Sequence, residues 1–140
     1  MNRNNKKGSA LVETAIILPI LLVIVFGILE FGWMMYKTNT LNNAAREGAR
    51  RAAVTPKPII AINIEDYVKN FIIFSYEASD LTITTVPTVP ASGDPVKVSV
   101  TLIYRELTPI ISLLDLIFSG TTLSLDGKKL TGEATMRYEL

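Results

Sequence analysis

The chemistry that this sequence suggests begins at Glu13, a carboxylate that follows Gly8 by five residues at the front of a long apolar stretch. A carboxylate costs on the order of 2.5–3.5 kcal/mol at the centre of a membrane helix, and less near the interface. If the chain is cut between Gly8 and Ser9, the new ammonium group at Ser9 lies one helical turn from Glu13. The two charges can then pair within one chain or between neighbouring chains. A pair between chains would set the axial register of packed helices.

The stretch after Glu13 is long enough to cross a membrane. Residues 14–29 carry no charge and would span about 24 Å as an α-helix. Apolar character resumes after Glu30 and continues to Tyr36, which extends the helix to about 34 Å, against a hydrocarbon core of about 30 Å. We therefore expect a membrane span with Glu30 near the far interface, where Trp33 and Tyr36 suit the aromatic belt.

The charges before the span predict its orientation. The N-terminal segment is polar and basic, with Arg3, Lys6 and Lys7. Under the positive-inside rule these residues keep the N-terminus in the cytoplasm and place the rest of the chain outside. The expected location is the cytoplasmic (inner) membrane, as a single-pass protein.

A removable secretory signal is the main alternative for this segment, because it also combines a basic start with an apolar core. No small-x-small cleavage site follows closely, since the residues there are bulky: Phe31, Trp33, Met34, Met35 and Tyr36. A buried core helix would be apolar along one stripe, whereas this segment is apolar on all sides. Two further hypotheses remain: an unprocessed, membrane-anchored envelope or adhesion module, and a secreted enzyme behind a cleaved signal.

Composition argues against most enzyme and nucleic-acid functions. The 140 residues include no His and no Cys, and the formal net charge is +1. Ser-His-Asp triads, thiol chemistry and Cys/His zinc sites are therefore excluded. A near-zero charge gives no basic face for phosphates. We expect no catalytic residues, no metal, no cofactor and no nucleic-acid partner.

The helix is predicted to continue through Val54. One face carries small or apolar residues at helical spacing: Leu41, Ala45, Gly48, Ala49 and Ala52. The other face carries Asn43, Arg46, Glu47, Arg50 and Arg51. We expect the first face to pack against the protein's own head, with another subunit as the alternative, and the second to face solvent.

The rest of the chain is predicted to be a small α+β head. Asn63 is expected to cap a short helix that runs to about Ser75, and residues 81–86 and 96–106 to form strands. A second short helix is expected after Pro109, to about Phe118, although its apolar residues are also a second candidate for membrane contact. A turn at Asp126–Gly127 then leads to a last strand. The predicted fold is a long N-terminal transmembrane helix and a head with two short helices and an antiparallel sheet of three or four strands.

Several short motifs together resemble the TadE-like family, minor pilin-like components of the tight-adherence (Tad/Flp) pilus machinery. The first resembles the processing site of type IV pilin-like precursors, Gly8-Ser9-Ala10-Leu11-Val12-Glu13. The others are Ala15, Pro19, Gly27-Ile28-x-Glu30-Phe31-Gly32 and Ala45-Arg46-Glu47-Gly48-Ala49-Arg50-Arg51-Ala52-Ala53. The resemblance covers residues 8–54 in motif detail and the remaining head only in size and layout.

The resemblance implies cleavage between Gly8 and Ser9 by a prepilin peptidase, membrane anchoring and a role in pilus assembly or secretion. Residues 1–8 would be a removed leader, residues 9–54 the assembly helix and residues 55–140 an extracytoplasmic head. Glu13 would set the register, and the expected contacts with partner helices are Pro19, Glu30, Arg46 and Arg50. The expected partners are the peptidase, other pilin-like subunits and the assembly platform. Thr14 after Glu13, where the major pilin usually has Tyr, and the long head both favour a minor component.

Overall fold

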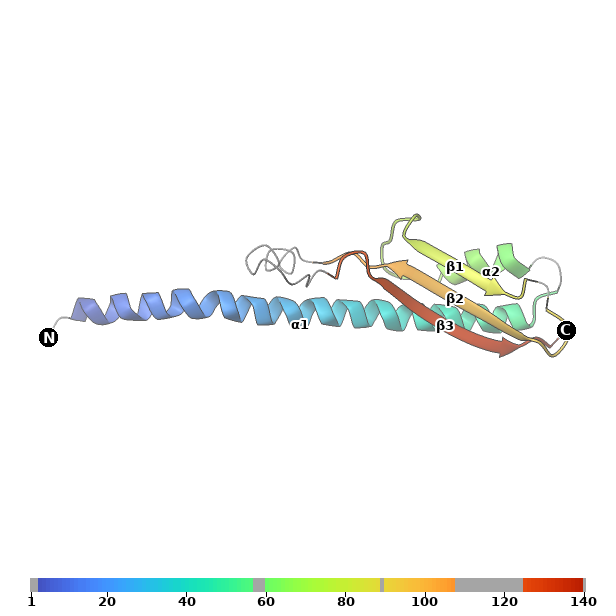
Figure 1. Cartoon of the computed structure of the whole chain (residues 1–140), viewed down its shortest axis with the longest axis horizontal. Coiled ribbons are helices and arrows are strands. Elements are labelled where there is room, and N and C mark those ends of the chain that lie inside the picture. The colour runs from blue at the N-terminus through green and yellow to red at the C-terminus, as the bar shows by residue number, and fades with distance from the viewer. Residues whose placement is uncertain (1–2, 57–59, 89, 108–124, 140) are drawn as a thin grey trace. The chain divides into compact units, whose positions relative to one another are not determined.

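The computed structural model describes residues 3–56, 60–88, 90–107 and 125–139 (Figure 1). It contains helices α1 (Arg3–Ala53) and α2 (Ile60–Lys69), followed by strands β1 (Leu81–Val86), β2 (Pro95–Ile103) and β3 (Lys129–Arg137). The strands form one antiparallel sheet in the order β1-β2-β3. The predicted α+β class, the long N-terminal helix and the small antiparallel sheet are therefore confirmed.

The described residues divide into two compact units at Trp33 and Met34 of α1. The span unit contains residues 3–33 and 106–107. The sheet unit contains residues 34–56, 60–88, 90–105 and 125–139.

In the span unit, α1 presents large apolar side chains on all sides. Among the described residues one helix, Gly8–Ala53, is long and apolar enough to cross a membrane; its most apolar window has a mean hydropathy of 2.7 and is not buried in the structure. The helix continues through Pro19, although proline cannot donate a hydrogen bond to the carbonyl of Ala15. The Thr14 hydroxyl donates to the Ala10 carbonyl at 2.9 Å, so this polar group is satisfied within its own helix.

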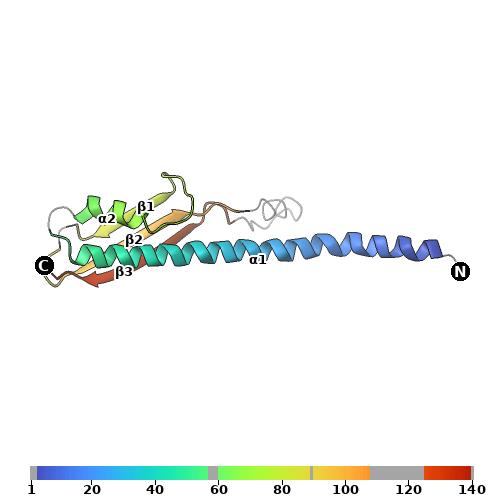
Figure 2. The same cartoon turned by 180° about the vertical axis from the view of Figure 1, so that it is seen from behind.

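In the sheet unit, the last part of α1 packs against one face of the sheet beside α2 (Figures 1 and 2). The predicted small-residue face is the buried one: Leu41, Ala45, Gly48, Ala49 and Ala52. Asn43, Arg46, Arg50 and Arg51 are exposed. The expectation that this face packs on the protein's own head is therefore confirmed.

Alternation along β2 decides which face of the sheet meets the helices. Val96, Val98, Val100 and Leu102 are buried, and Tyr104 just beyond the strand is buried with them. Their neighbours point to the other face, where threonines and serine lie across from one another. There the Lys97 ammonium pairs with the Glu133 carboxylate at 2.7 Å, and the Ser99 hydroxyl donates to Glu133 at 2.9 Å.

Two glycines allow the close approach of the packed layers. A Cβ atom on Gly132 of β3 would lie 2.5 Å from the Leu41 carbonyl oxygen and from the Asn42 nitrogen, both backbone atoms of α1. A Cβ atom on Gly48 of α1 would meet the side chains of Val68 and Val98. Strand and helix therefore touch through backbone at Gly132, where any side chain would separate them.

The predicted short helix after Pro58 differs from the observed one. α2 runs from Ile60 to Lys69, so the predicted cap at Asn63 and the end near Ser75 are wrong. Ile64 and Val68 are buried, whereas Phe71 lies past the end of the helix and is partly exposed. The chain leaves the helix through turn-type hydrogen bonds, such as Phe71 N–H to the Val68 carbonyl at 3.0 Å, which propensity alone did not reveal. The second predicted helix, to Phe118, lies outside the described residues.

We expect Gly132→Ala to lower the free energy of unfolding by about 1–3 kcal/mol, the usual cost of overpacking a close contact. The neighbouring atoms belong to the α1 backbone and cannot rotate away. Chemical denaturation of the full chain in detergent, followed by circular dichroism, measures the change.

Gly32→Ala is the matched control, because a Cβ there meets nothing within 4 Å. It should leave stability unchanged or slightly higher, since Ala favours helix over Gly. Equal stability of the Gly132→Ala protein and the unmodified protein would contradict the close packing of β3 on α1.

Candidate functional site

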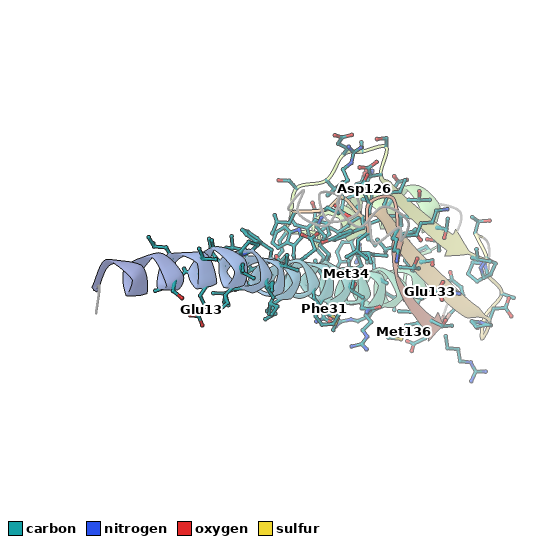
Figure 3. All side chains as sticks on the ribbon, turned by 60° about the vertical axis from the view of Figure 1, so that its left-hand side comes forward. Glu13, Phe31, Met34, Asp126, Glu133 and Met136 are labelled. Carbon is teal, nitrogen blue, oxygen red and sulfur yellow. The ribbon has the colours of Figure 1, made fainter. Side chains whose placement is uncertain are left out.

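The residues predicted to be processed lie near the start of α1. Gly8, Ser9 and Glu13 are all helical and exposed, and Glu13 projects from the ribbon in Figure 3. Ser9 and Glu13 are four residues apart, so they lie on nearly the same side of the helix. Among the side chains that the structure describes, none forms an ion pair with Glu13. The carboxylate is therefore available to an ammonium group at Ser9 or to a neighbouring chain.

The helix beyond Glu13 offers apolar contact area and no reactive groups. Its exposed large side chains include Ile16, Leu18, Ile20, Ile24, Ile28, Leu29 and Phe31. A patch of this length is far larger than monomeric soluble proteins expose, and it indicates contact with lipid or with other helices. This surface can insert in a membrane or pack against other helices.

Glu30 is the exception on this surface, because it is only 1% exposed. Its Oε1 atom accepts a hydrogen bond at 2.9 Å from the backbone N–H of Leu107, within the span unit. Glu30 therefore does not face water in this structure. Its contact with a partner subunit stays a prediction.

Lys37, which shares the helix face of Glu30 in sequence, is also buried, at 7% exposure. Its ammonium nitrogen lies 4.9 Å from the centre of the Tyr104 ring and 5.6 Å from that of Phe74. These distances are typical of cation–π interactions, which stabilise a charge that has lost part of its water. Aromatic residues far along the chain therefore cover this lysine.

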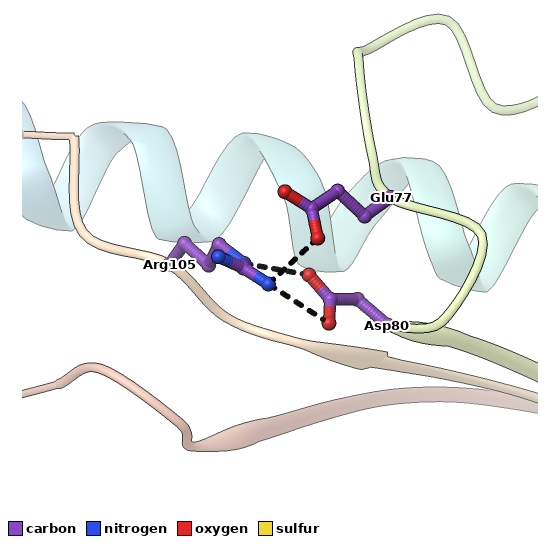
Figure 4. Close-up of polar contacts among 3 residues, drawn as sticks. All are labelled: Glu77, Asp80 and Arg105. Atoms are coloured by element: carbon purple, nitrogen blue, oxygen red, sulfur yellow. Dashed lines mark hydrogen bonds and ion pairs between the residues drawn. The ribbon is translucent and has the colours of Figure 1, made fainter.

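Arg105 forms the main ionic cluster of the sheet unit (Figure 4). Its Nε atom donates to Asp80 Oδ2 at 2.7 Å and its second terminal nitrogen to Glu77 Oε2 at 2.9 Å. The hydrogen bond from Arg105 holds the pKa of Asp80 below its ordinary value, and the same bond raises the pKa of Arg105. The cluster fixes the loop before β1 to the end of β2.

A cavity of about 290 Å³ adjoins this cluster. It is lined by Lys37, Ser75, Tyr76, Glu77, Asp80, Leu102, Ile103 and Arg105. Both carboxylates are already used by Arg105, and the described residues contain no group of three metal-ligating acids. Within that part of the chain, the cavity has no arrangement suited to metal or acid–base chemistry.

Arg46 and Arg50 lie on the outer side of α1, as predicted for a solvent-facing surface. Beside them, Arg51 stacks over the Tyr67 ring at 5.8 Å. Glu47, Arg50, Arg51, Val54 and Tyr67 line a small recess of about 100 Å³. The roles of Arg46, Arg50 and Pro19 as partner contacts stay predictions.

Sequence reasoning missed three features. It did not predict the Arg105 cluster, the aromatic cover over Lys37, or the backbone contact at Gly132. Asp80 and Arg105 are 25 positions apart, and a turn aspartate followed by a strand-end arginine is too common a pattern to predict a pair.

The comparisons with known proteins give one match. The family model described as TadE-like protein matches residues 8–50, a range that lies within α1 and ends before the sheet. No curated protein and no solved structure matches the chain. The match confirms the resemblance inferred from the motifs. With the apolar helix, it indicates a membrane protein associated with the Tad pilus.

The ion pair of Asp80 with Arg105 predicts a specific response to acid. A carboxyl group whose pKa is lower in the folded state stabilises the fold above its unfolded pKa, and this contribution disappears as pH falls. The unmodified protein should lose stability below about pH 4, and Asp80→Asn should lose less over the same range. Denaturation midpoints measured from pH 7 to pH 3 test this.

Arg105→Gln is the paired control, because it removes the cause of the shift and keeps the carboxyl group. It should reduce the acid dependence in the same way, and the double variant should differ little from either single one. Glu133, whose pKa Lys97 also lowers, accounts for part of the remaining slope. Identical slopes in the unmodified and Asp80→Asn proteins would contradict the coupling.

Proposed function

We propose that this chain, whose residues 8–50 are TadE-like, is a minor pilin-like component of the Tad/Flp pilus machinery. In this proposal a prepilin peptidase cuts between Gly8 and Ser9, and the shortened α1 joins a bundle of pilin-like subunits. The observation that carries the proposal is the first part of α1 itself. It exposes large apolar side chains, and at its start lies an exposed carboxylate, Glu13, that forms no ion pair with the described side chains.

The location of the cut agrees with the local properties of the helix. Gly8 lies close to the free end of α1, where helices fray. Glycine costs about 1 kcal/mol relative to alanine in a helix, so the turn around Gly8 opens more easily than its neighbours. No side chain crowds Gly8, because a Cβ there would meet nothing within 4 Å. A membrane peptidase therefore has an accessible and easily unwound bond to cut.

The cut would change the charge balance of the assembly helix. Removing residues 1–8 deletes the basic leader and creates an ammonium group at Ser9. In a packed bundle, an unpaired carboxylate is strongly disfavoured by desolvation, so Glu13 requires a cation. The ammonium group of its own or a neighbouring chain supplies one, and a neighbour's group fixes how far each new helix is inserted.

The proposed topology follows from the same segment. The span lies in the inner membrane with its N-terminus in the cytoplasm, and residues 55–140 lie outside. The partners are the peptidase, other pilin-like subunits, the assembly platform and the membrane. We propose a structural role and no enzymatic one, since the described residues offer contact surfaces and ion pairs within the chain.

Processing is tested by the mass of the protein isolated from its native host. The expected mature chain begins at Ser9. Gly8→Ala should accumulate as the full-length precursor, because alanine strengthens the helix where the peptidase must open it. Gly27→Ala, which changes a glycine farther along α1 with the same open space around it, should be processed normally.

Two outcomes of this measurement would contradict the proposal. A mature chain that begins at Met1 or Asn2 and functions normally favours an unprocessed anchored module. A start well beyond residue 30 favours a secreted protein behind a signal peptide.

The role of Glu13 is tested separately from processing. Glu13→Gln should insert in the membrane as well as the unmodified protein, since an amide is tolerated more readily than a charge. It should be recovered with other pilin-like subunits about tenfold less, equivalent to about 1.4 kcal/mol of lost pairing. Quantitative immunoblots of membrane and sheared-pilus fractions measure both quantities. Normal pilus formation with Glu13→Gln would remove the register role from this proposal.

A further inference from the structure

We propose that Glu30 holds the chain at Leu107 against the outer lipid interface, so that the protein makes a second contact with the bilayer beside α1. This inference rests on the membrane anchor of the proposed function and adds a surface to it. The partner is the acyl–headgroup boundary of a phospholipid bilayer.

The contact joins two positions that are 77 residues apart within the span unit. The Leu107 N–H donates to Glu30 Oε1 at 2.9 Å. Because Glu30 belongs to α1, this bond fixes the chain beyond β2 at the level of one particular helical turn. That level is seven residues, or about 10 Å of helix, on the N-terminal side of Lys37.

Leu107 and the residues that flank Glu30 in sequence are apolar and exposed. Leu107 is 52% exposed, and the neighbouring residues of α1 include Leu29 at 52% and Phe31 at 58%. Leu107 thus adds to the exposed apolar surface of the span unit. Since the surface of α1 at this level is proposed to contact lipid, we expect lipid to contact Leu107 as well.

The pairing also satisfies what a lipid interface demands of the backbone. An N–H group without a partner costs several kcal/mol in hydrocarbon, and a buried carboxylate is costly unless it accepts hydrogen bonds. On a water-exposed surface, water would hydrogen-bond to both the Glu30 carboxylate and the Leu107 N–H, so neither group would need the other. Glu30 and the Leu107 N–H meet each other's requirement within the chain, at a depth where water is scarce.

The length of the span places Glu30 at the right depth. Residues 14–29 account for about 24 Å of helix, which is most of the hydrocarbon thickness. Trp33 follows within one turn, in the position of an interfacial aromatic anchor. A leucine fixed at Glu30 would therefore sit at the inner edge of the outer headgroup layer.

Nitroxide labels test the contact in the full chain. The sequence has no Cys, so Leu107→Cys, Leu29→Cys and Ile73→Cys each give one labelled site. Leu29 matches Leu107 in residue type and exposure, and Ile73 is an apolar residue of the sheet unit that is 76% exposed. The proteins are reconstituted in phosphatidylcholine–phosphatidylglycerol vesicles, and the collision rates with oxygen, which favours lipid, and with a nickel chelate, which favours water, are measured.

We expect the oxygen-to-nickel ratio at 107 to be close to that at 29 and severalfold above that at 73. A ratio at 107 as low as that at 73, while 29 reports lipid, overturns this inference and leaves the anchor intact. Low collision rates with both reagents at 107 also overturn it, because they indicate a protein contact. A lipid signal at both 107 and 73 overturns the local role of Glu30. A water signal at 29 overturns the anchor itself.

A second set of variants tests Glu30 as the positioning residue. Glu30→Ala removes the acceptor and should lower the ratio at 107 severalfold while leaving that at 29 unchanged. Glu30→Gln keeps an oxygen acceptor and should restore the lipid signal at 107. If the ratio at 107 is the same with Ala as with Glu at position 30, the hydrogen bond does not place Leu107 and the inference fails.

Discussion

Everything else in this molecule depends on one constraint, which is that a single helix must satisfy two different surroundings along its length. Up to Trp33, α1 exposes large apolar side chains, which suits lipid or neighbouring helices. From Leu41 onward it buries Ala44, Ala45, Ala49 and Ala52 against its own sheet. Small residues in the second part let the layers approach closely. Large residues in the first part prevent such a close approach, but they provide a wide contact area for lipid or for neighbouring helices.

Within the sheet unit, the sheet is held on the last part of α1 by contacts that cannot readily be exchanged. Gly132 brings β3 to backbone contact with Leu41 and Asn42, so the strand and the helix have one relative position there. Arg105 ties the loop before β1 to the end of β2 through Asp80 and Glu77. Lys37 lies under Tyr104 and Phe74. A sheet held in this way cannot readily slide along the part of α1 that it contacts.

Periodicity made much of this fold predictable. The structure confirms three patterns: the uncharged run after Glu13, the small-residue face of α1 and the alternation in β2. Each pattern reflects which side of the element meets its surroundings. Contacts between distant residues were not predictable, because Asp80, Arg105 and Gly132 carry no local pattern that names their partners. The bounds of α2 were missed because an apolar residue such as Phe71 fits a helical stripe equally well when the chain has already turned. For Gly8, Ser9 and Glu13, the sequence gives the type and spacing, whereas their function depends on molecules other than this chain.

The two carboxylates of the apolar helix show how one physical problem has two solutions. Glu30 has a backbone N–H of its own chain within hydrogen-bond distance. The free-energy cost of burying its carboxylate is therefore offset whenever the chain is folded. Glu13 is exposed, and none of the described side chains forms an ion pair with it. Near a membrane surface such a group can stay hydrated, but within a bundle of helices it cannot. The hydrogen bond of Glu30 therefore forms when the chain itself folds. In the proposed function, the carboxylate of Glu13 creates a requirement that a new ammonium group at Ser9 or a neighbouring chain fulfils, and assembly would then depend on processing.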